Sequence, residues 1–566
     1  MTKRRNADEF SSEFERDKDS IRSQLLEGTI ENYKRISSET IVDTKEKAEQ
    51  SFMQYCELSS RIRNTIFTLY PKSDDGGEVV AMGTEDSNAC GLLEDLEGPR
   101  LYEYEPTLVP KNKLCVVDEK TVQHVAAGGL HSAVIHRNGT VSTWGANDEY
   151  ALGRGEVGED DNHLIKPMLT SELGEVMKDI IQIDAGDNHT IVLDIHGRAY
   201  VCGMYKDMDS GKWKDSKVSE DFEIKGNHKF PTEVEGFGGK VRMICAGSSW
   251  NAALSEDGFL YTWGMGNSGQ LARSKSMGAK KIKATYIDST GAPNNEYEDF
   301  DLTKSFMGKV FEEGKDTNGK SILRFKYFEQ KIHRTFLTPQ KVEWNGEHLV
   351  SKREVIHLAC GDIHFLVVAR DPGAFQTRVY SSGCSSFGQL GHGGTENLHE
   401  LTPIEVLDDK NICKVAAGNS HSLALSMDGK GCYSWGKIDM GALGLYDETK
   451  TQKYSTVDFV GTPKKVAFPD TLGDNLLFDI IAGDTTSFAL TNISTVYSWG
   501  YNENSQTGHY NDGEIPLIAR PRLLDVIASV NNGIESSNRK PVAKNCRVTR
   551  IAAGGQHSLM VIKRYL

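Results

Sequence analysis

The sequence predicts an all-β fold, a seven-bladed β-propeller closed by strands from both termini, with an N-terminal helical extension. Three observations predict it: two short motifs each recur seven times, tight turns join them, and the series starts on one motif and ends on the other. Each repeat is about four short strands, too small a sheet to bury its own faces, so the repeats must pack on one another. A radial array leaves only short, protected edges, whereas an open solenoid needs capping units.

The first motif is a small residue, Gly, two variable residues and usually His. Its spacings of 58, 61, 114, 57, 65 and 71 residues indicate one unit per interval, with a large insertion in the third interval. A side chain repeated in most blades meets the same packing demand in each, so the His is predicted to be buried and hydrogen-bonded between strands. The seven copies end at His131, His189, Trp250, His364, His421, Thr486 and His557.

The second motif is an aromatic or small residue followed by Gly. Between the two motifs, apolar segments flank Gly-containing turns such as 137–139 and 428–429, which predicts β-hairpins. The Trp-Gly pairs of the second motif are predicted to combine a core aromatic side chain with a close approach of two backbone segments at the Gly. The seven copies lie at Met82-Gly83, Trp144-Gly145, Cys202-Gly203, Trp263-Gly264, Ser382-Gly383, Trp435-Gly436 and Trp499-Gly500.

The order of the motifs predicts how the ring closes. The series begins with the second motif at Gly83 and ends with the first motif at His557, so each terminus holds part of one blade. The segment "GEVVAMG" (77–83) is therefore expected to pair with "VTRIAAGGQHSLMVI" (548–562). The predicted propeller spans residues 76–566.

Two segments fall outside the repeats. In residues 1–75, an amphipathic helix is expected because Phe10, Phe14, Ile21 and Leu25 are spaced at helical intervals among charged residues. The insertion covers about 274–330 and is basic at first, then acidic.

Composition limits the classes of function. A net charge of −15 argues against coating nucleic acid through the overall field. Ten scattered cysteines indicate neither a metal site nor a disulfide framework. The sequence has no long apolar run of the kind that a signal peptide or a membrane span requires. A soluble nuclear or cytoplasmic protein is therefore expected. With no catalytic constellation and no phosphate-binding loop, neither covalent catalysis nor a cofactor is expected.

Several motifs resemble a known family. The segments 126–154, "AGDNH" (185–189), "GNSGQLAR" (266–273) and the closing "GGQH" (554–557) are similar to those of the regulator of chromosome condensation family, whose members are seven-bladed propellers. The resemblance covers Gly77 to Lys563. The family's founding nuclear member is the guanine-nucleotide exchange factor for the small GTPase Ran, so the resemblance implies that activity and a nuclear location, with the cytoplasm as the alternative.

The resemblance also implies a GTPase-binding face. The segment 204–217, "MYKDMDSGKWKDSK", stands where the exchange factor has a wedge that enters the GTPase. Such a face binds the nucleotide-free GTPase and thereby weakens nucleotide binding. An alternative for Asp187 is a turn cap, since Asp also occupies its position at 362 and 484. The implied partner-binding residues are Asp86, His131, Asp187, Lys206, Asp207, Asp209 and Arg273.

Two departures from the family pattern support a second hypothesis. Ser249, before Trp250, replaces an acidic residue, and Ser420 replaces an extra His, both at positions linked to exchange. A non-catalytic scaffold for protein interaction is therefore the alternative. The plant ultraviolet-B receptor of the same fold would predict dense tryptophans, and this chain has 7.

The basic start of the insertion is similar to an excursion that contacts the nucleosome in the founding member. The resemblance implies a chromatin contact, although such a charge run is usually a solvated surface. The lysines concerned are Lys275, Lys280, Lys281 and Lys283.

Overall fold

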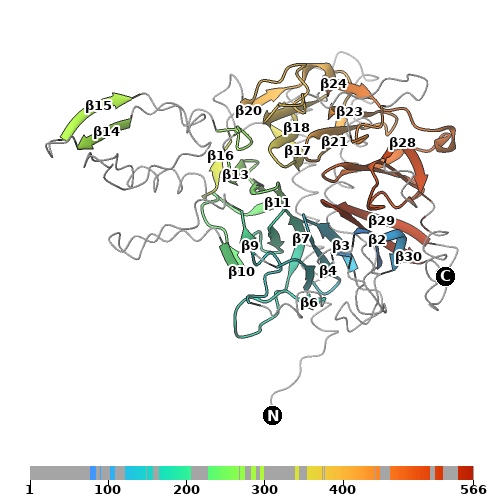
Figure 1. The fold of residues 1–566 in the computed structure, drawn as a ribbon, viewed down its shortest axis with the longest axis horizontal. Helices are drawn as coiled ribbons and strands as arrows, with labels where there is room; N and C mark the ends of the chain where they lie inside the picture. Colours follow the sequence, from blue (N-terminus) through green and yellow to red (C-terminus); the bar gives the residue numbers. More distant parts are fainter. Residues whose placement is uncertain are drawn as a thin grey trace, which may run out of the picture.

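Seven four-stranded antiparallel sheets are arranged around a central channel (Figure 1). The computed structural model describes residues 77–84, 89–90, 102–108, 122–147, 149–156, 165–205, 227–266, 268–273, 282–287, 293–298, 338–342, 344, 353–371, 374, 376–438, 440–445, 459–509, 517–524, 526 and 546–564. The predicted seven-bladed propeller is confirmed. The expected N-terminal helix lies outside the described residues.

Each blade begins at the channel and is built outward. The innermost strands are β3 (Val122–Ala127), β7 (Ile180–Ala185), β11 (Val241–Ala246), β17 (Glu354–Cys360), β21 (Ile412–Ala417), β25 (Leu477–Ala482) and β29 (Cys546–Ala553). The second strands are β4 (His131–His136), β8 (His189–Asp194), β12 (Trp250–Ser255), β18 (His364–Arg370), β22 (His421–Ser426), β26 (Thr486–Thr491) and β30 (His557–Arg564).

The outer half of each blade holds two more strands. The third strands are β5 (Val141–Gly145), β9 (Ala199–Met204), β13 (Leu260–Gly264), β19 (Thr377–Gly383), β23 (Cys432–Lys437), β27 (Val496–Tyr501) and β1 (Glu78–Thr84). The outermost are β6 (Lys166–Pro167), β10 (Asn227–Glu233), β16 (Gln340–Lys341), β20 (Leu398–Pro403), β24 (Phe459–Lys465), β28 (Leu517–Leu524) and β2 (Tyr102–Leu108).

In the described part of the chain, two strands and two 3-10 helices lie outside the seven sheets. The strands β14 (Ile282–Ile287) and β15 (Pro293–Glu298) form a separate hairpin between β13 and β16. Two 3-10 helices, η7 (Glu405–Leu407) and η8 (Asp470–Leu472), connect an outermost strand to the next innermost strand. Residues of the expected insertion therefore separate the third and fourth strands of one blade.

The predicted closure by the two termini is confirmed. β1, from the N-terminal side, pairs antiparallel with β30, and Gly83 lies opposite His557. The sheet order β2-β1-β30-β29 therefore combines two strands from each end of the chain. Apolar residues of both strands, Val79 and Val561 among them, are buried in one cluster with Trp144 of the next blade. The ring is thus sealed by backbone pairing and by apolar burial.

The predicted structural role of the repeated His is also confirmed. His364 and His421 are buried, and their Nε2 atoms lie 2.9 Å from hydroxyl groups of Ser422 and Ser487 in the following blades. His557 spans the closure in the same way, with its Nε2 atom 2.7 Å from the Ser132 hydroxyl. Each of these side chains satisfies its Nε2 atom across a seam between blades, where an unsatisfied buried group would be costly.

Candidate functional site: the central channel and its mouth

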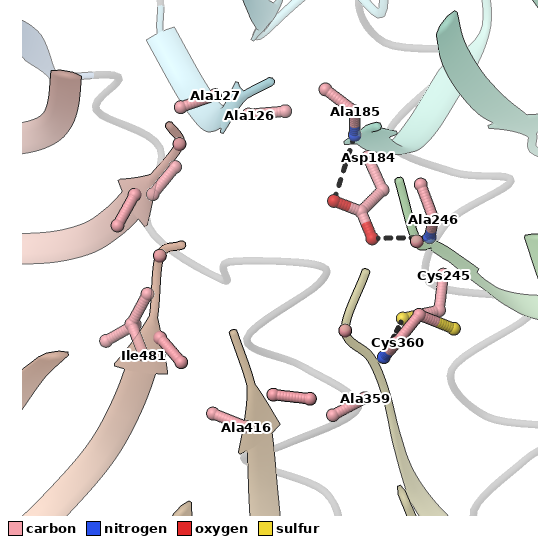
Figure 2. Close-up of a pocket in the computed structure, with 18 of the residues that line it drawn as sticks. Ala126, Ala127, Asp184, Ala185, Cys245, Ala246, Ala359, Cys360, Ala416 and Ile481 are labelled. Atoms are coloured by element: carbon pink, nitrogen blue, oxygen red, sulfur yellow. Dashed lines mark hydrogen bonds between the residues drawn. The ribbon is translucent and has the colours of Figure 1, made fainter. Parts of the chain in front are cut away.

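The central channel is a cavity of about 290 Å³ lined by all seven innermost strands. Figure 2 looks into it: the Asp184 carboxylate accepts hydrogen bonds from the amides of Ala185 and Ala246, at 3.0 and 2.9 Å. The Cys360 amide approaches the Cys245 sulfur at 3.1 Å beside this carboxylate. Burial raises the pKa of Asp184 to about 6.

One end of the channel, here called the channel mouth, is formed by the residue after the Gly of each first motif. Backbone bonds join these turns around the ring. The amide of Asp187 donates to the Ser248 carbonyl at 3.0 Å, and that of Asn419 to the Asp484 carbonyl at 3.1 Å. Fixed loops therefore set the positions of the side chains. The channel mouth consists of Gly129, Asp187, Ser248, Asp362, Asn419, Asp484 and Gly555.

Three carboxyl groups, those of Asp187, Asp362 and Asp484, lie together at the channel mouth. Burial raises the pKa of Asp362 well above its usual range, and the charges of Asp484 and Asp187 raise it further. Burial and the Asp187 charge raise the pKa of Asp484 to about 6. The Asp187 carboxylate accepts a hydrogen bond of 2.5 Å from the Ser248 hydroxyl in the next blade. This acidic group is suited to receive a cationic side chain or compete for a metal-bound partner.

Two of the expected partner-binding residues are buried inside the propeller. His131 is 1% exposed, and its Nε2 atom lies 2.9 Å from the Thr190 hydroxyl of the next blade. Burial, with the nearby His189 and His557, lowers the pKa of His131 to about 3. It belongs to the seam between blades, like the other repeated histidines, and offers almost no surface to a partner.

Arg273 is likewise 1% exposed. It follows a Leu-Ala pair that matches Leu390-Gly391 of the blade formed by β17–β20, where the next residue, His392, places its Nε2 atom 2.8 Å from the Ser381 hydroxyl. Its position therefore belongs to the interior of the repeat, and the resemblance alone could not reveal that.

Asp187 is the expected site residue that lies at the channel mouth, where it is half-buried. Its described side-chain bond joins it to the neighbouring blade rather than to its own turn, which favours a role at the mouth over the turn-cap alternative.

All but one of the other expected residues lie outside the described residues: Asp86, Lys206, Asp207, Asp209, Lys275, Lys280 and Lys281. Lys283 lies in β14, opposite Tyr297. The strands that precede Asp86 and Lys206, β1 and β9, both end on the side of the propeller that carries the channel mouth. β1 ends beside His557, and the Met204 amide of β9 donates to the Asn188 carbonyl at 2.7 Å.

The two departing serines also lie at this end. The carbonyls of Ser249 and Ser420 each accept an amide bond of 2.9 Å, from Met265 and Lys437. The Ser420 hydroxyl donates to the Asn419 side chain at 2.6 Å. Both positions are therefore neutral at the rim of an acidic mouth.

Sequence reasoning missed Asp362 and Asp484 as members of the site. The aligned third position of the first motif carries the signal, because Asp, Ser and Asn replace Gly there in five of seven copies. Only ring closure brings these residues together.

The fold and the site together define the class of this protein, which is a closed seven-bladed propeller with an acidic channel mouth. The chain belongs to the regulator of chromosome condensation family, because the family model described as the RCC1-like domain matches residues 78–560.

Curated relatives include members of different functional types. The Regulator of chromosome condensation of Xenopus laevis is 25% identical over 495 residues, covering 86% of this chain and 90% of that protein. The Ultraviolet-B receptor UVR8 of Arabidopsis thaliana is 25% identical over 435 residues, covering 76% of each. The human E3 ubiquitin-protein ligase HERC2 is also 25% identical, and the match covers 76% of this chain but 8% of HERC2.

Among solved structures, Prp20p of Saccharomyces cerevisiae has a TM-score of 0.61 at 20% identity and covers 88% of this chain and 94% of its own. That structure was described with the binding of Prp20p to Gsp1p and histones. Human WBSCR16 has a TM-score of 0.57 at 17% identity, and the match covers 86% of this chain and 100% of the WBSCR16 chain. These similarities support the fold. Among the described residues no helix is long and apolar enough to span a membrane.

Proposed function

We propose that this chain is a guanine-nucleotide exchange factor for a Ran-like small GTPase, which it binds through the face that carries the channel mouth. The acidic mouth is the observation that carries the proposal: the carboxyls of Asp187, Asp362 and Asp484 gather at one end of the channel. The regulator of chromosome condensation from Xenopus laevis, matched over 90% of its length, supports the same activity.

Exchange by such a face needs no covalent chemistry. A protein that binds the nucleotide-free GTPase more tightly than the loaded form must weaken nucleotide binding by the same factor. Buried or half-buried carboxylates compete with the nucleotide for cationic groups of the GTPase, and their attraction is strong because little water screens them. In this proposal Asp187 contacts the GTPase directly, with Asp86 and the wedge residues Lys206, Asp207 and Asp209.

The proposed setting is the nucleus, with a contact to chromatin through Lys275, Lys280, Lys281 and Lys283. The binding of yeast Prp20p to Gsp1p and histones supports both partners. Lysines act on nucleosomes through their charge, so this contact should weaken as the salt concentration rises.

The test is release of labelled GDP from Ran, followed by stopped-flow fluorescence. The wild-type chain should accelerate release, and Asp187→Asn should slow the accelerated rate by at least about tenfold, equivalent to about 1.4 kcal/mol of coupling. Asp474→Asn is the matched control because Asp474 is exposed beside η8, at the opposite end of the blades.

The second candidate is a non-catalytic scaffold, favoured by the neutral residues Ser249 and Ser420 at the rim. Capture of Ran with and without added nucleotide separates the two. An exchange factor should release Ran when nucleotide is added, whereas a scaffold that retains Ran under both conditions and leaves GDP release unaccelerated would refute the exchange proposal.

A further inference from the structure

A second ring of channel residues lies five positions before the mouth on each innermost strand. In every blade, the pairing of the innermost and second strands has a register shift immediately before this residue. Such bulges re-aim the side chain that follows them. We call the ring the channel belt; all its members line the cavity, and they are His124, Gln182, Met243, His357, Lys414, Asp479 and Arg550.

Five consecutive blades contribute ionisable groups to the belt. In ring order these are His357, Lys414, Asp479, Arg550 and His124. The Lys414 ammonium forms an ion pair with the Asp479 carboxylate. Burial lowers the pKa of Arg550 to about 10, with the Asp479 charge opposing that shift, so Arg550 is cationic at neutral pH. Two cations and one carboxylate leave this arc with one excess positive charge, in surroundings where a buried charge is poorly screened.

The two histidines at the ends of the arc are neutral hydrogen-bonding groups. Burial and the charge of Arg550 lower the pKa of His124 to about 3. Burial and the charge of Lys414 lower the pKa of His357 well below its usual range. The Nδ1 atoms of both rings are buried without a hydrogen-bond partner in the part of the chain that is described. A neutral imidazole carries one N–H, which an anion can accept.

The rest of the channel directs an anion to this arc. The side-chain amide of Gln182 already has two hydrogen bonds with Ile244. Its nitrogen donates to the Ile244 carbonyl at 2.7 Å, and its oxygen accepts from the Ile244 backbone amide at 3.0 Å. Asp184 lies two residues further along its strand, and the carboxyls of the mouth lie further still. Negative charge is therefore concentrated toward the mouth, and the belt forms the opposite end of the cavity. A cavity of about 290 Å³ is at the lower limit for ligand pockets and suits a small ion.

We propose that the channel belt, at the end of the cavity opposite the channel mouth, binds a small inorganic oxyanion of the sulfate or phosphate type. The anion neutralises the excess charge of Lys414 and Arg550 and accepts hydrogen bonds from the imidazoles of His124 and His357. This site is separate from the face proposed for GTPase binding, and it does not depend on exchange activity.

The test is isothermal titration calorimetry of the full chain with sodium sulfate at neutral pH, against sodium chloride at equal ionic strength. Sulfate is chosen because its charge does not change near neutral pH. Wild-type protein should give a saturable one-site binding signal with sodium sulfate and no such signal with sodium chloride. Lys414→Met removes one cation and should weaken sulfate binding by at least about tenfold, or about 1.4 kcal/mol. Lys464→Met, which removes an exposed lysine of β24, should leave the affinity unchanged.

A second variant covers the case in which Lys414→Met does not fold because Asp479 loses its partner. His357→Leu leaves the ion pair intact and removes one donor, so the folded variant should bind sulfate about tenfold more weakly. Circular dichroism establishes which variants are folded. No saturable heat with the wild-type chain, or wild-type affinity in every folded belt variant, would overturn the proposal.

Discussion

At the scale of single residues, the same motif position serves two purposes. The fifth position is buried and links neighbouring blades, as His364 does through the Ser422 hydroxyl. The third position lies on the channel mouth and differs from blade to blade, so it carries the acidic groups Asp187, Asp362 and Asp484. Repeated residues therefore stabilise the ring, whereas the varied residue beside them gives one end its chemistry.

The half-buried carboxyl of Asp484 should make stability depend on pH. Its pKa is 3.8 when unperturbed and about 6 in the folded chain, so the folded state holds the proton more tightly. The carboxyl group of Asp484 therefore does not lower the free energy of unfolding below about pH 4, and the free energy of unfolding falls as the pH rises from about 4 to 6. Asp484→Asn should raise the free energy of unfolding by on the order of 1–3 kcal/mol above pH 6 and leave it unchanged below pH 4.

Urea unfolding at several pH values measures this effect. Asp474→Asn, at an exposed carboxyl, is the control and should follow the wild-type profile throughout. A gain for Asp484→Asn of equal size at acid and neutral pH would contradict the electrostatic explanation.

At the scale of elements, each blade is shaped by irregularities at fixed places. One register shift precedes the belt residue on the innermost strand, as between Ile412 and Lys414. In the same blade another lies beside the Gly of the second motif, between Ser434 and Gly436. Gly436 has a φ of 113°, and a Cβ there would lie 2.4 Å from the Ser420 carbonyl oxygen. The strand can therefore approach the first-motif turn only where no side chain is present.

Gly436→Ala should destabilise the chain by more than about 1 kcal/mol, because both the backbone conformation and the contact with Ser420 are unfavourable for a side chain. Thermal or urea unfolding provides the measurement. Gly394→Ala is the matched control, since its nearest neighbouring atom would be 4.0 Å away, and its effect should stay within about 0.5 kcal/mol. Equal losses in the two variants would argue against the steric explanation.

At the scale of the whole molecule, closure depends on strands from both ends of the chain. β1 and β2 come from the N-terminal side and β30 and β29 from the C-terminal side, and all four form one sheet. The buried cluster of that blade extends into the neighbouring blade through Val122, Val134 and Trp144. Loss of either half exposes this cluster and opens the ring.

Removal of residues 546–566 should therefore abolish cooperative unfolding and cause aggregation, measured by calorimetry and light scattering. A circular permutant is the control. It joins Arg564 to Gly77 through a short Gly-Ser linker, because β30 ends where β1 begins, and opens the chain at the exposed Gly394. This permutant should keep the ring and unfold cooperatively. Cooperative unfolding of the truncated chain would show that closure is dispensable.

Much of the architecture could be predicted from local pattern. The hairpins, the buried Trp-Gly and His positions and the pairing of the two termini follow from motifs a few residues long, because each blade solves the same packing problem. The site could be predicted less well. Resemblance pointed to His131 and Arg273, but both side chains are buried in repeat positions, and it omitted Asp362 and Asp484.

The sequence by itself determined the number of blades, their strand order and the closing sheet, since these depend on repeated short-range patterns. Only the tertiary structure decided which unrepeated side chains meet in the channel. Residues that adjoin around the mouth are separated by 57 residues or more along the chain, and they become neighbours only because the seven sheets close into a ring. The acidic mouth and the cationic belt are therefore properties of the closed propeller, and no single repeat contains them.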